Sequence, residues 1–193
     1  MLSALFLLTV LAAAPDAGSQ PVAPAGIAAA ASPLLPRYCV PAPTPSDPGV
    51  LRCAGLIGTD VYLAGDEANR RVALGAPAGF PPPLPAPAML GRTLDWRILG
   101  ARPIAGIFLY RLTSGDEALR WLVVTKPGSM ERPGCIVALF DGNAEPEADV
   151  RAASFADARA PGFRCGIDRA TIQGRAADTT RRLGAAWLQA AGR

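Results

Sequence analysis

Residues 135–166 read CIVALFDGNAEPEADVRAASFADARAPGFRCG, a stretch with a cysteine near each end. Residues 136–140 form a continuous apolar run, which predicts a buried strand. Three acidic residues follow within 145–149, and negative charge near a helix N-terminus is favoured by about 0.3–1 kcal/mol per charge. The sequence therefore predicts a strand followed by a helix over residues 147–160, capped by Asn143 and ended by a Pro-Gly pair.

A calcium loop is the alternative for the same stretch. Asp141, Asn143 and Glu145 match the first three ligand positions of an EF-hand loop. That loop needs glycine at its sixth position and glutamate at its twelfth. This chain has Pro146 and Ala152 there. We therefore favour a helix N-terminus over a metal site.

Four cysteines, Cys39, Cys53, Cys135 and Cys165, follow an apolar N-terminal segment. An even number of cysteines in an exported chain predicts disulfides, and four cysteines allow three pairings. Short loops close most easily, so we favour Cys39–Cys53 with Cys135–Cys165. Each bond would stabilise the fold by roughly 3–4 kcal/mol. No C-x-x-C is present, which argues against a zinc site or a redox pair.

The N-terminus, MLSALFLLTVLAAAP, predicts a signal peptide over residues 1–20. Its apolar run is shorter than the roughly 20 residues that a spanning helix needs. Small residues at 12–18 and at 28–31 offer two cleavage regions. Residues 21–36 are rich in alanine and proline, which predicts a disordered linker. We expect a periplasmic or secreted protein.

Strand patterns separated by turn residues dominate the middle of the chain. The expected strands cover residues 37–41, 50–54, 59–64, 70–75, 93–99, 104–112, 119–126 and 135–141. Most connections are short, which favours antiparallel pairing. The sequence thus predicts a single α+β domain over residues 37–175, with a largely antiparallel sheet, one helix between Cys135 and Cys165, and a C-terminal helix.

Two other segments carry alternatives. Residues 78–90 are proline-rich and predict a stiff surface loop rather than a ligand for an aromatic groove. Residues 176–193 predict an amphipathic helix with Leu183 and Trp187 on its apolar face. We expect this helix to dock on its own domain, with contact to a membrane surface as the alternative.

Composition excludes several function classes. The chain of 193 residues contains no histidine. A Ser-His or Cys-His nucleophile and His-bound metals are therefore impossible. The net charge is +3 without a block of like charges, so we expect no nucleic-acid partner. We also expect no cofactor, because no phosphate-binding glycine loop is present.

Asp95, Trp96 and Arg97 form a polar cluster on an expected strand. Alternation places Asp95 and Arg97 on one face and Trp96 on the other. A cross-strand ion pair opposite a core tryptophan is one interpretation, and a binding surface made of these three residues is the other. Lys126 and Ser129 could form a Ser-Lys dyad, but the Pro-Gly between them predicts a turn with a solvated lysine.

Four short motifs in this order resemble a group of small exported alphaproteobacterial proteins with no assigned activity. They are C-x-G-x-x-G at 53–58, DWR at 95–97, VVTK at 123–126 and FRCGxD at 163–168. The resemblance covers about residues 38–170. It implies export and a single domain, and it supplies no catalytic or ligand residue.

The leading functional hypothesis is a non-enzymatic binding or interaction module, for example an inhibitor, that meets an unidentified protein or small molecule in the cell envelope. It is favoured because the sequence carries no nucleophile or metal pattern. One alternative is a histidine-free hydrolase that uses two carboxylates in a deep pocket. The other is a structural envelope protein that contacts a membrane or partner through residues 176–193.

Overall fold

A computed structural model describes residues 26–192. The signal peptide expected over residues 1–20 lies outside this range. The described chain forms two sheets, two α-helices and one short 3-10 helix. The strands are β1 (Ile27–Pro33), β2 (Val40–Pro41), β3 (Leu51–Leu56), β4 (Thr59–Ala64), β5 (Arg71–Leu74), β6 (Ala88–Leu99), β7 (Arg102–Ser114), β8 (Glu117–Lys126), β9 (Cys135–Asp141) and β10 (Thr171–Gln173). The helices are η1 (Pro36–Tyr38), α1 (Ala148–Arg159) and α2 (Asp178–Ala191).

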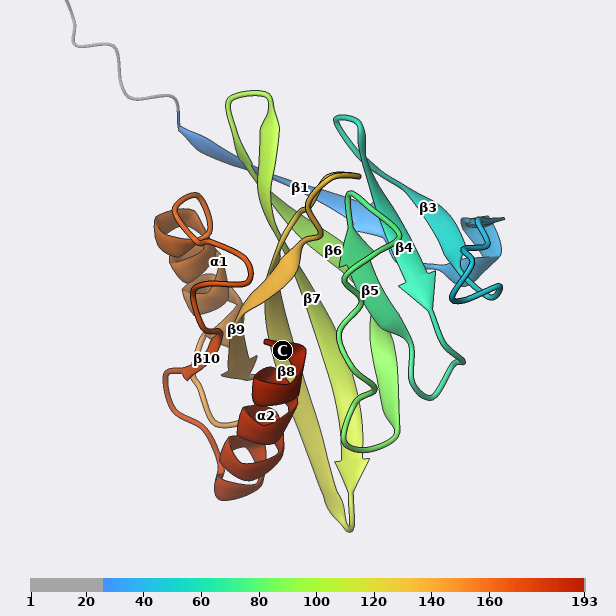
Figure 1. The fold of residues 1–193 in the computed structure, drawn as a ribbon. Coiled ribbons are helices and arrows are strands. Elements are labelled where there is room, and N and C mark those ends of the chain that lie inside the picture. Colours follow the sequence, from blue (N-terminus) through green and yellow to red (C-terminus); the bar gives the residue numbers. More distant parts are fainter. Residues whose placement is uncertain (1–25, 193) are drawn as a thin grey trace, which may run out of the picture.

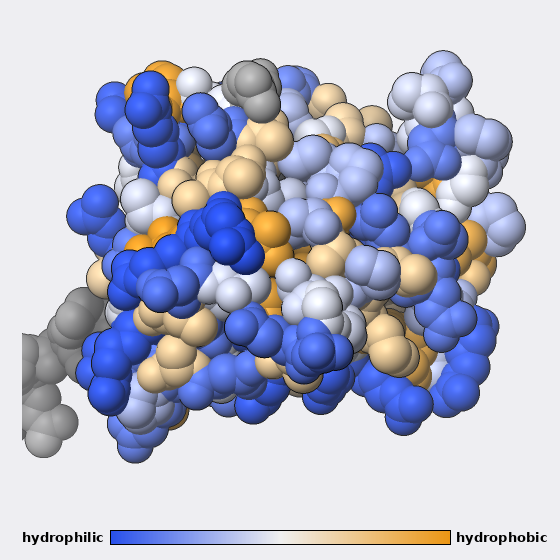
Figure 2. Space-filling model, turned by 90° about the horizontal axis from the view of Figure 1, so that it is seen from below, coloured by the Kyte–Doolittle hydropathy of each residue, from blue (hydrophilic) through white to orange (hydrophobic). Residues whose placement is uncertain are grey.

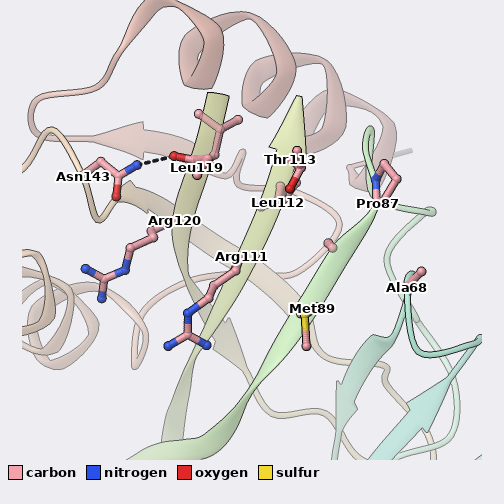
Figure 3. Close-up of a pocket in the computed structure, with 11 residues that line it drawn as sticks. Ala68, Pro87, Met89, Arg111, Leu112, Thr113, Leu119, Arg120 and Asn143 are labelled. Carbon is pink, nitrogen blue, oxygen red and sulfur yellow. Dashed lines mark hydrogen bonds between the residues drawn. The ribbon is translucent and has the colours of Figure 1, made fainter. Parts of the chain in front are cut away.

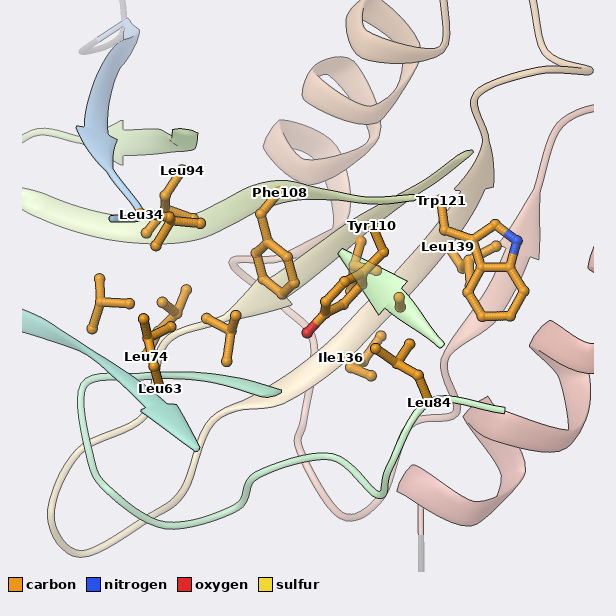
Figure 4. Packing of buried hydrophobic residues seen from close by; sticks show 14 of the residues in the cluster. Leu34, Leu63, Leu74, Leu84, Leu94, Phe108, Tyr110, Trp121, Ile136 and Leu139 are labelled. Atoms are coloured by element: carbon orange, nitrogen blue, oxygen red, sulfur yellow. The ribbon is translucent and has the colours of Figure 1, made fainter. Parts of the chain in front are cut away.

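A six-stranded sheet in the order β1-β6-β7-β8-β9-β10 forms the central layer. Helix α1 covers one of its faces, and the four-stranded sheet β2-β3-β4-β5 and helix α2 lie on the other (Figure 1). Successive side chains of β7 point to opposite faces of the sheet, so each face has its own core. Phe108 and Tyr110 point into the main core with the second sheet (Figure 4), whereas Ile107 packs in the cluster under α1.

The expected α+β class is confirmed, with two helices, antiparallel-rich sheets and two disulfides. Two features differ from the expectation. The strands divide into two sheets rather than one, because β4 presents Val61 and Leu63 to the six-stranded sheet and buries both completely. In addition, β10 pairs with β9 in parallel.

The prediction of a disordered linker over 21–36 is wrong for residues 27–33, which form β1. This strand pairs antiparallel with β6 over its whole length. Ser32 and Leu34 point inward and are 6% and 3% exposed. The Trp96 Nε1 donates a hydrogen bond to the Ser32 hydroxyl over 2.9 Å. The domain therefore begins before residue 37, because the apolar partners of this alanine-rich segment lie on β6.

The favoured disulfide pairing is confirmed. Cys39 is bonded to Cys53, and Cys135 is bonded to Cys165. The first bond ties η1 to β3. The second ties the start of β9 to the segment after α1. Two disulfides are typical of proteins outside the cytoplasm, because glutathione and thioredoxin keep cytosolic thiols reduced.

Helix α1 begins one residue later than expected, and Asn143 does not cap it. The residue before the helix is Glu147, which has a left-handed φ of 54° and makes no capping hydrogen bond through its side chain. The Asn143 Nδ2 instead donates to the Ala118 carbonyl oxygen over 2.6 Å. Asn143 therefore ties the β9–α1 connection to β8.

The C-terminal helix docks on its own domain. Trp187 and Leu188 of α2 are buried in the main core. The Trp187 Nε1 donates to the Pro82 carbonyl oxygen over 3.0 Å, so the helix also holds the proline-rich loop. The apolar face expected over 176–193 is thus occupied by the domain itself. Among the described residues, no helix is long and apolar enough to cross a membrane.

Candidate functional site

The structure separates the three residues of the DWR motif. Trp96 is fully buried, so it cannot belong to a binding surface. Asp95 and Arg97 lie on the other face of β6, as alternation requires. Arg97 does form an ion pair, but its partner is Asp157 on α1 rather than a residue of a neighbouring strand. Both hydrogen bonds of this bidentate pair are 2.6 Å long.

Asp95 and Arg97 line a shallow groove between β1, β6 and α1, with a volume of about 380 Å³. Asp149 of α1 lies in the same groove. Burial raises the pKa of the Asp95 carboxyl, and the negative charge of Asp149 raises it further. Hydrogen bonds to the Asp157 carboxylate raise the pKa of Arg97, which favours the positively charged form of its guanidinium. We call this site the aspartate groove.

Lys126 and Ser129 do not form a dyad. The Lys126 Nζ donates to the carbonyl oxygens of Pro161 and Phe163 over 3.1 and 2.7 Å. The Ser129 hydroxyl accepts a hydrogen bond from the Arg132 backbone N–H. Burial lowers the pKa of Lys126, and the Arg102 charge adds to this effect. Lys126 therefore fastens the segment after α1 to the end of β8.

The residues of the calcium alternative serve the scaffold. The Asp141 carboxylate is fully buried and accepts backbone N–H groups of Asn143, Ala144 and Ala177. Glu145 accepts the Arg175 backbone N–H and pairs with the Arg151 guanidinium. Within residues 26–192, no cluster of three metal-ligating side chains occurs. Asp141 and Glu145 thus join the start of α1 to the segment before α2.

A second groove lies at the end of the long β7–β8 hairpin, on the sheet face that carries α1, and has a volume of about 500 Å³. Six exposed side chains larger than alanine line it, and they come from β6, β7, β8 and adjacent connections. They are Pro87, Met89, Arg111, Thr113, Arg120 and Asn143. Figure 3 shows Met89, Arg111 and Arg120 projecting toward the same side of the strands. We call this site the arginine groove.

Arg111 and Arg120 are directly opposite each other in the β7–β8 register. Opposed residues of an antiparallel pair have Cα atoms about 4.5–5.5 Å apart. None of the residues that line this groove is acidic. Neither arginine forms an ion pair with any residue between 26 and 192. The groove therefore concentrates two cationic charges that the described part of the chain does not neutralise.

Like charges directly opposite each other destabilise a sheet. The other groove residues are compatible with a ligand that is partly apolar. Met89 is directly opposite Arg111 on β6 and is 61% exposed. An apolar side chain and two guanidinium groups thus stand side by side across three strands. This arrangement can bind an anion that carries an apolar group.

Sequence reasoning missed Arg111 and Arg120, although the signal was present. The loop between β7 and β8 consists of Gly115 and Asp116, and Gly115 has a φ of 59°. A two-residue loop fixes the register of a hairpin. Counting outward from Ser114 and Glu117 brings the two arginines opposite each other after three further pairs. Met89 could not be placed in this way, because an irregularity in β6 shifts its register.

Helix α2 and the end of the β7–β8 hairpin lie at the bottom of the molecule in the view of Figure 1. Seen from below, hydrophilic side chains cover most of this end of the molecule, and smaller hydrophobic areas show between them (Figure 2).

Comparisons with protein-family models, with curated proteins and with solved structures find no match. They do not bear on the resemblance to exported alphaproteobacterial proteins, which stays a prediction.

Proposed function

We propose that the protein is an exported, non-enzymatic binding module and that the arginine groove is its contact surface. The two disulfides support export, because such bonds persist in the periplasm or outside the cell. One observation carries the assignment of the surface. Arg111 and Arg120 face each other without an acidic partner among the described residues, an arrangement that costs stability unless a ligand neutralises it.

The shape of the groove supports binding rather than hydrolysis. The groove lies open on the sheet and has no acid in its lining, so the described chain supplies no general base there. Its volume of about 500 Å³ falls in the range of small-molecule sites. A groove of this size would take a small molecule of the cell envelope, or the exposed end of a larger one.

The methionines provide a direct test. After removal of the signal peptide the chain keeps two, Met89 in the groove and Met130 in the loop before β9. Both are exposed, at 61% and 77%. Protein labelled with ¹³C at the methionine methyl groups would be mixed with the low-molecular-weight fraction of a bacterial envelope extract. We expect the Met89 signal to shift and the Met130 signal to stay.

A matched pair of variants controls this experiment. Ala118→Trp fills the groove from an exposed position and should abolish the Met89 shift. Ala101→Trp places the same side chain at the opposite end of β7, in the turn after β6, and should leave the shift intact. An unmoved Met89 signal in every extract, or a shift that survives Ala118→Trp, would refute the assignment of the surface.

A carboxylate-dependent hydrolase is the second candidate, and the aspartate groove favours it. Asp95 and Asp149 lie in one groove, and the pKa of Asp95 is raised by burial and by Asp149. Glycoside hydrolysis uses two carboxyl groups on either side of the bond that is cleaved, one of them as the general acid. Release of reducing sugar ends from purified cell-wall glycan, lost in both Asp95→Asn and Asp149→Asn, would support it. No release by the unaltered protein would exclude it for this substrate.

A further inference from the structure

We infer that the arginine groove binds a peptide C-terminus whose last residue is apolar. This inference rests on the proposed function and adds the chemical class of the ligand. Three groups of the groove carry it: the opposed guanidinium groups of Arg111 and Arg120, the exposed thioether of Met89, and hydrogen-bond acceptors on Thr113 and Asn143.

The guanidinium groups select a planar anion. Each guanidinium presents parallel N–H donors whose spacing matches the two oxygens of a carboxylate. Arg111 and Arg120 are a register pair, so one carboxylate placed between them can accept from both. The aspartate groove on the same face would repel the same ligand, because Asp95 and Asp149 line it. The charges of the two grooves therefore favour binding of the carboxylate at the arginine groove.

The neighbours of the arginines select what is attached to the carboxylate. Met89 lies opposite Arg111 on the side away from Arg120, and Pro87 continues the apolar wall. A ligand held by both arginines therefore places its next carbon atoms against apolar surface. Burying an apolar side chain there is favourable by roughly 25 cal/mol per Å² removed from water, whereas a second charge would be penalised.

The polar atoms of the groove distinguish a peptide end from a simple organic acid. The Asn143 Nδ2 is engaged with the Ala118 carbonyl, which leaves the Asn143 Oδ1 as an acceptor at the groove. The Thr113 hydroxyl makes no side-chain hydrogen bond with the described residues and also lies in the lining. A C-terminal residue carries an amide N–H next to its carboxylate, and these oxygens can accept it.

Isothermal titration of the mature protein with four small probes tests each element. N-acetyl-leucine has the carboxylate, the apolar side chain and the N–H. N-acetyl-leucinamide lacks the charge, 4-methylpentanoate lacks the N–H, and inorganic phosphate lacks the apolar group. We expect N-acetyl-leucine to bind best, with the amide at least tenfold weaker and 4-methylpentanoate several-fold weaker.

Variants locate the binding. Arg111→Gln and Arg120→Gln should each weaken N-acetyl-leucine at least tenfold, and Arg92→Gln, an exposed arginine of β6 outside the groove lining, should change the affinity by less than twofold. Equal binding of acid and amide, a preference for phosphate, or no response to Arg111→Gln would overturn the inference. If the envelope extract still moves the Met89 signal in those cases, the proposed function stands with another ligand. If it does not, both fail.

Discussion

Arg111 and Arg120 occupy directly opposite positions on β7 and β8, and among residues 26–192 neither has an acidic partner. A pair selected for folding alone would carry opposite charges or none at this place. Natural proteins often keep such unfavourable arrangements where a ligand is bound, at the expense of stability. The opposed arginines of the arginine groove are therefore what we expect of the proposed binding surface.

The first prediction follows from this cost. Arg111→Glu places an opposite charge across from Arg120 and should raise the free energy of unfolding by about 0.2–1 kcal/mol. The same variant should lose binding of N-acetyl-leucine. Urea unfolding measures the first effect, and Arg92→Glu, away from this pair, should bring no gain. A lower free energy of unfolding in Arg111→Glu would mean that the charges of Arg111 and Arg120 do not repel each other in the folded protein.

The second prediction concerns the bond between β1 and the core. Ser32→Ala leaves the buried Trp96 Nε1 without its acceptor and should lower the free energy of unfolding by about 1–3 kcal/mol. Ser154→Ala, at an exposed position of α1, should change it little or raise it slightly. Denaturant titration compares the two. Equal effects of the two substitutions would contradict the claim that the Ser32–Trp96 hydrogen bond stabilises the fold.

The third prediction concerns where the expected signal peptide would be cleaved. Cutting within residues 28–31 would remove most of β1, which pairs with β6 from Ile27 to Pro33. If the protein is exported as we propose, we expect the mature chain to keep Gly26 and all residues after it. Intact mass before and after reduction and alkylation measures this, and four thiols should become reactive only on reduction. A mature N-terminus inside 28–31 would show that β1 is dispensable.

The fourth prediction concerns Asp141 and pH. Burial alone would raise the pKa of this carboxyl, but hydrogen bonds from Ala177, Thr180, Asn143 and Ala144 outweigh burial and lower it. Its stabilisation is therefore present above the unfolded pKa of about 3.9 and is lost as the pH falls through the lower folded pKa. Asp141→Asn should cost about 2 kcal/mol at pH 7.

Unfolding curves at pH 7 and at acidic pH measure this dependence. The difference between the unaltered protein and Asp141→Asn should shrink as the pH falls below about 4. Asp116→Asn, in the exposed β7–β8 turn, serves as the control and should leave stability unchanged at both pH values. A difference that grows on acidification would mean that the folded pKa is raised.

The fifth prediction uses the turn between β3 and β4. Ile57 and Gly58 form a two-residue loop with φ values of 49° and 71°, and positive φ at both central residues is typical of a type I′ turn. A β-branched residue is strained there, whereas Asn is preferred. Ile57 is also 52% exposed. Ile57→Asn should raise the free energy of unfolding by about 1 kcal/mol, and thermal unfolding would show a higher midpoint. A lower midpoint would show that Ile57 makes a contact worth more than the strain.

Local patterns predicted the parts of the fold that depend on neighbours in sequence. The apolar run 136–140, the acidic residues after it and the Pro-Gly pair lead to β9 and α1, and short loops lead to the disulfide pairing. In contrast, β1 was missed because its composition is that of a linker, and its order comes from a partner strand more than 60 residues away, including the Ser32–Trp96 bond. Distant contacts of this kind leave no local signal.

The candidate site shows the same limit. Asp95 and Arg97 were found as a polar pair, yet the ion-pair partner of Arg97 is Asp157, and α1 cannot be positioned against β6 from sequence. Arg111 and Arg120 could have been paired from the Gly115-Asp116 loop alone. The lack of an acidic neighbour could not have been predicted from this loop. It depends on how every other described segment packs around the end of the hairpin.

Side-chain NMR of the arginine Nε–Hε groups tests the central claim most directly. The mature protein would be titrated with N-acetyl-leucine and, separately, with N-acetyl-leucinamide. We expect the Arg111 and Arg120 signals to shift together with the acid and to stay in place with the amide, while the Arg92 signal remains unchanged throughout. Unmoved Arg111 and Arg120 signals at a concentration that shifts other arginines would contradict the claim that this groove is the binding surface.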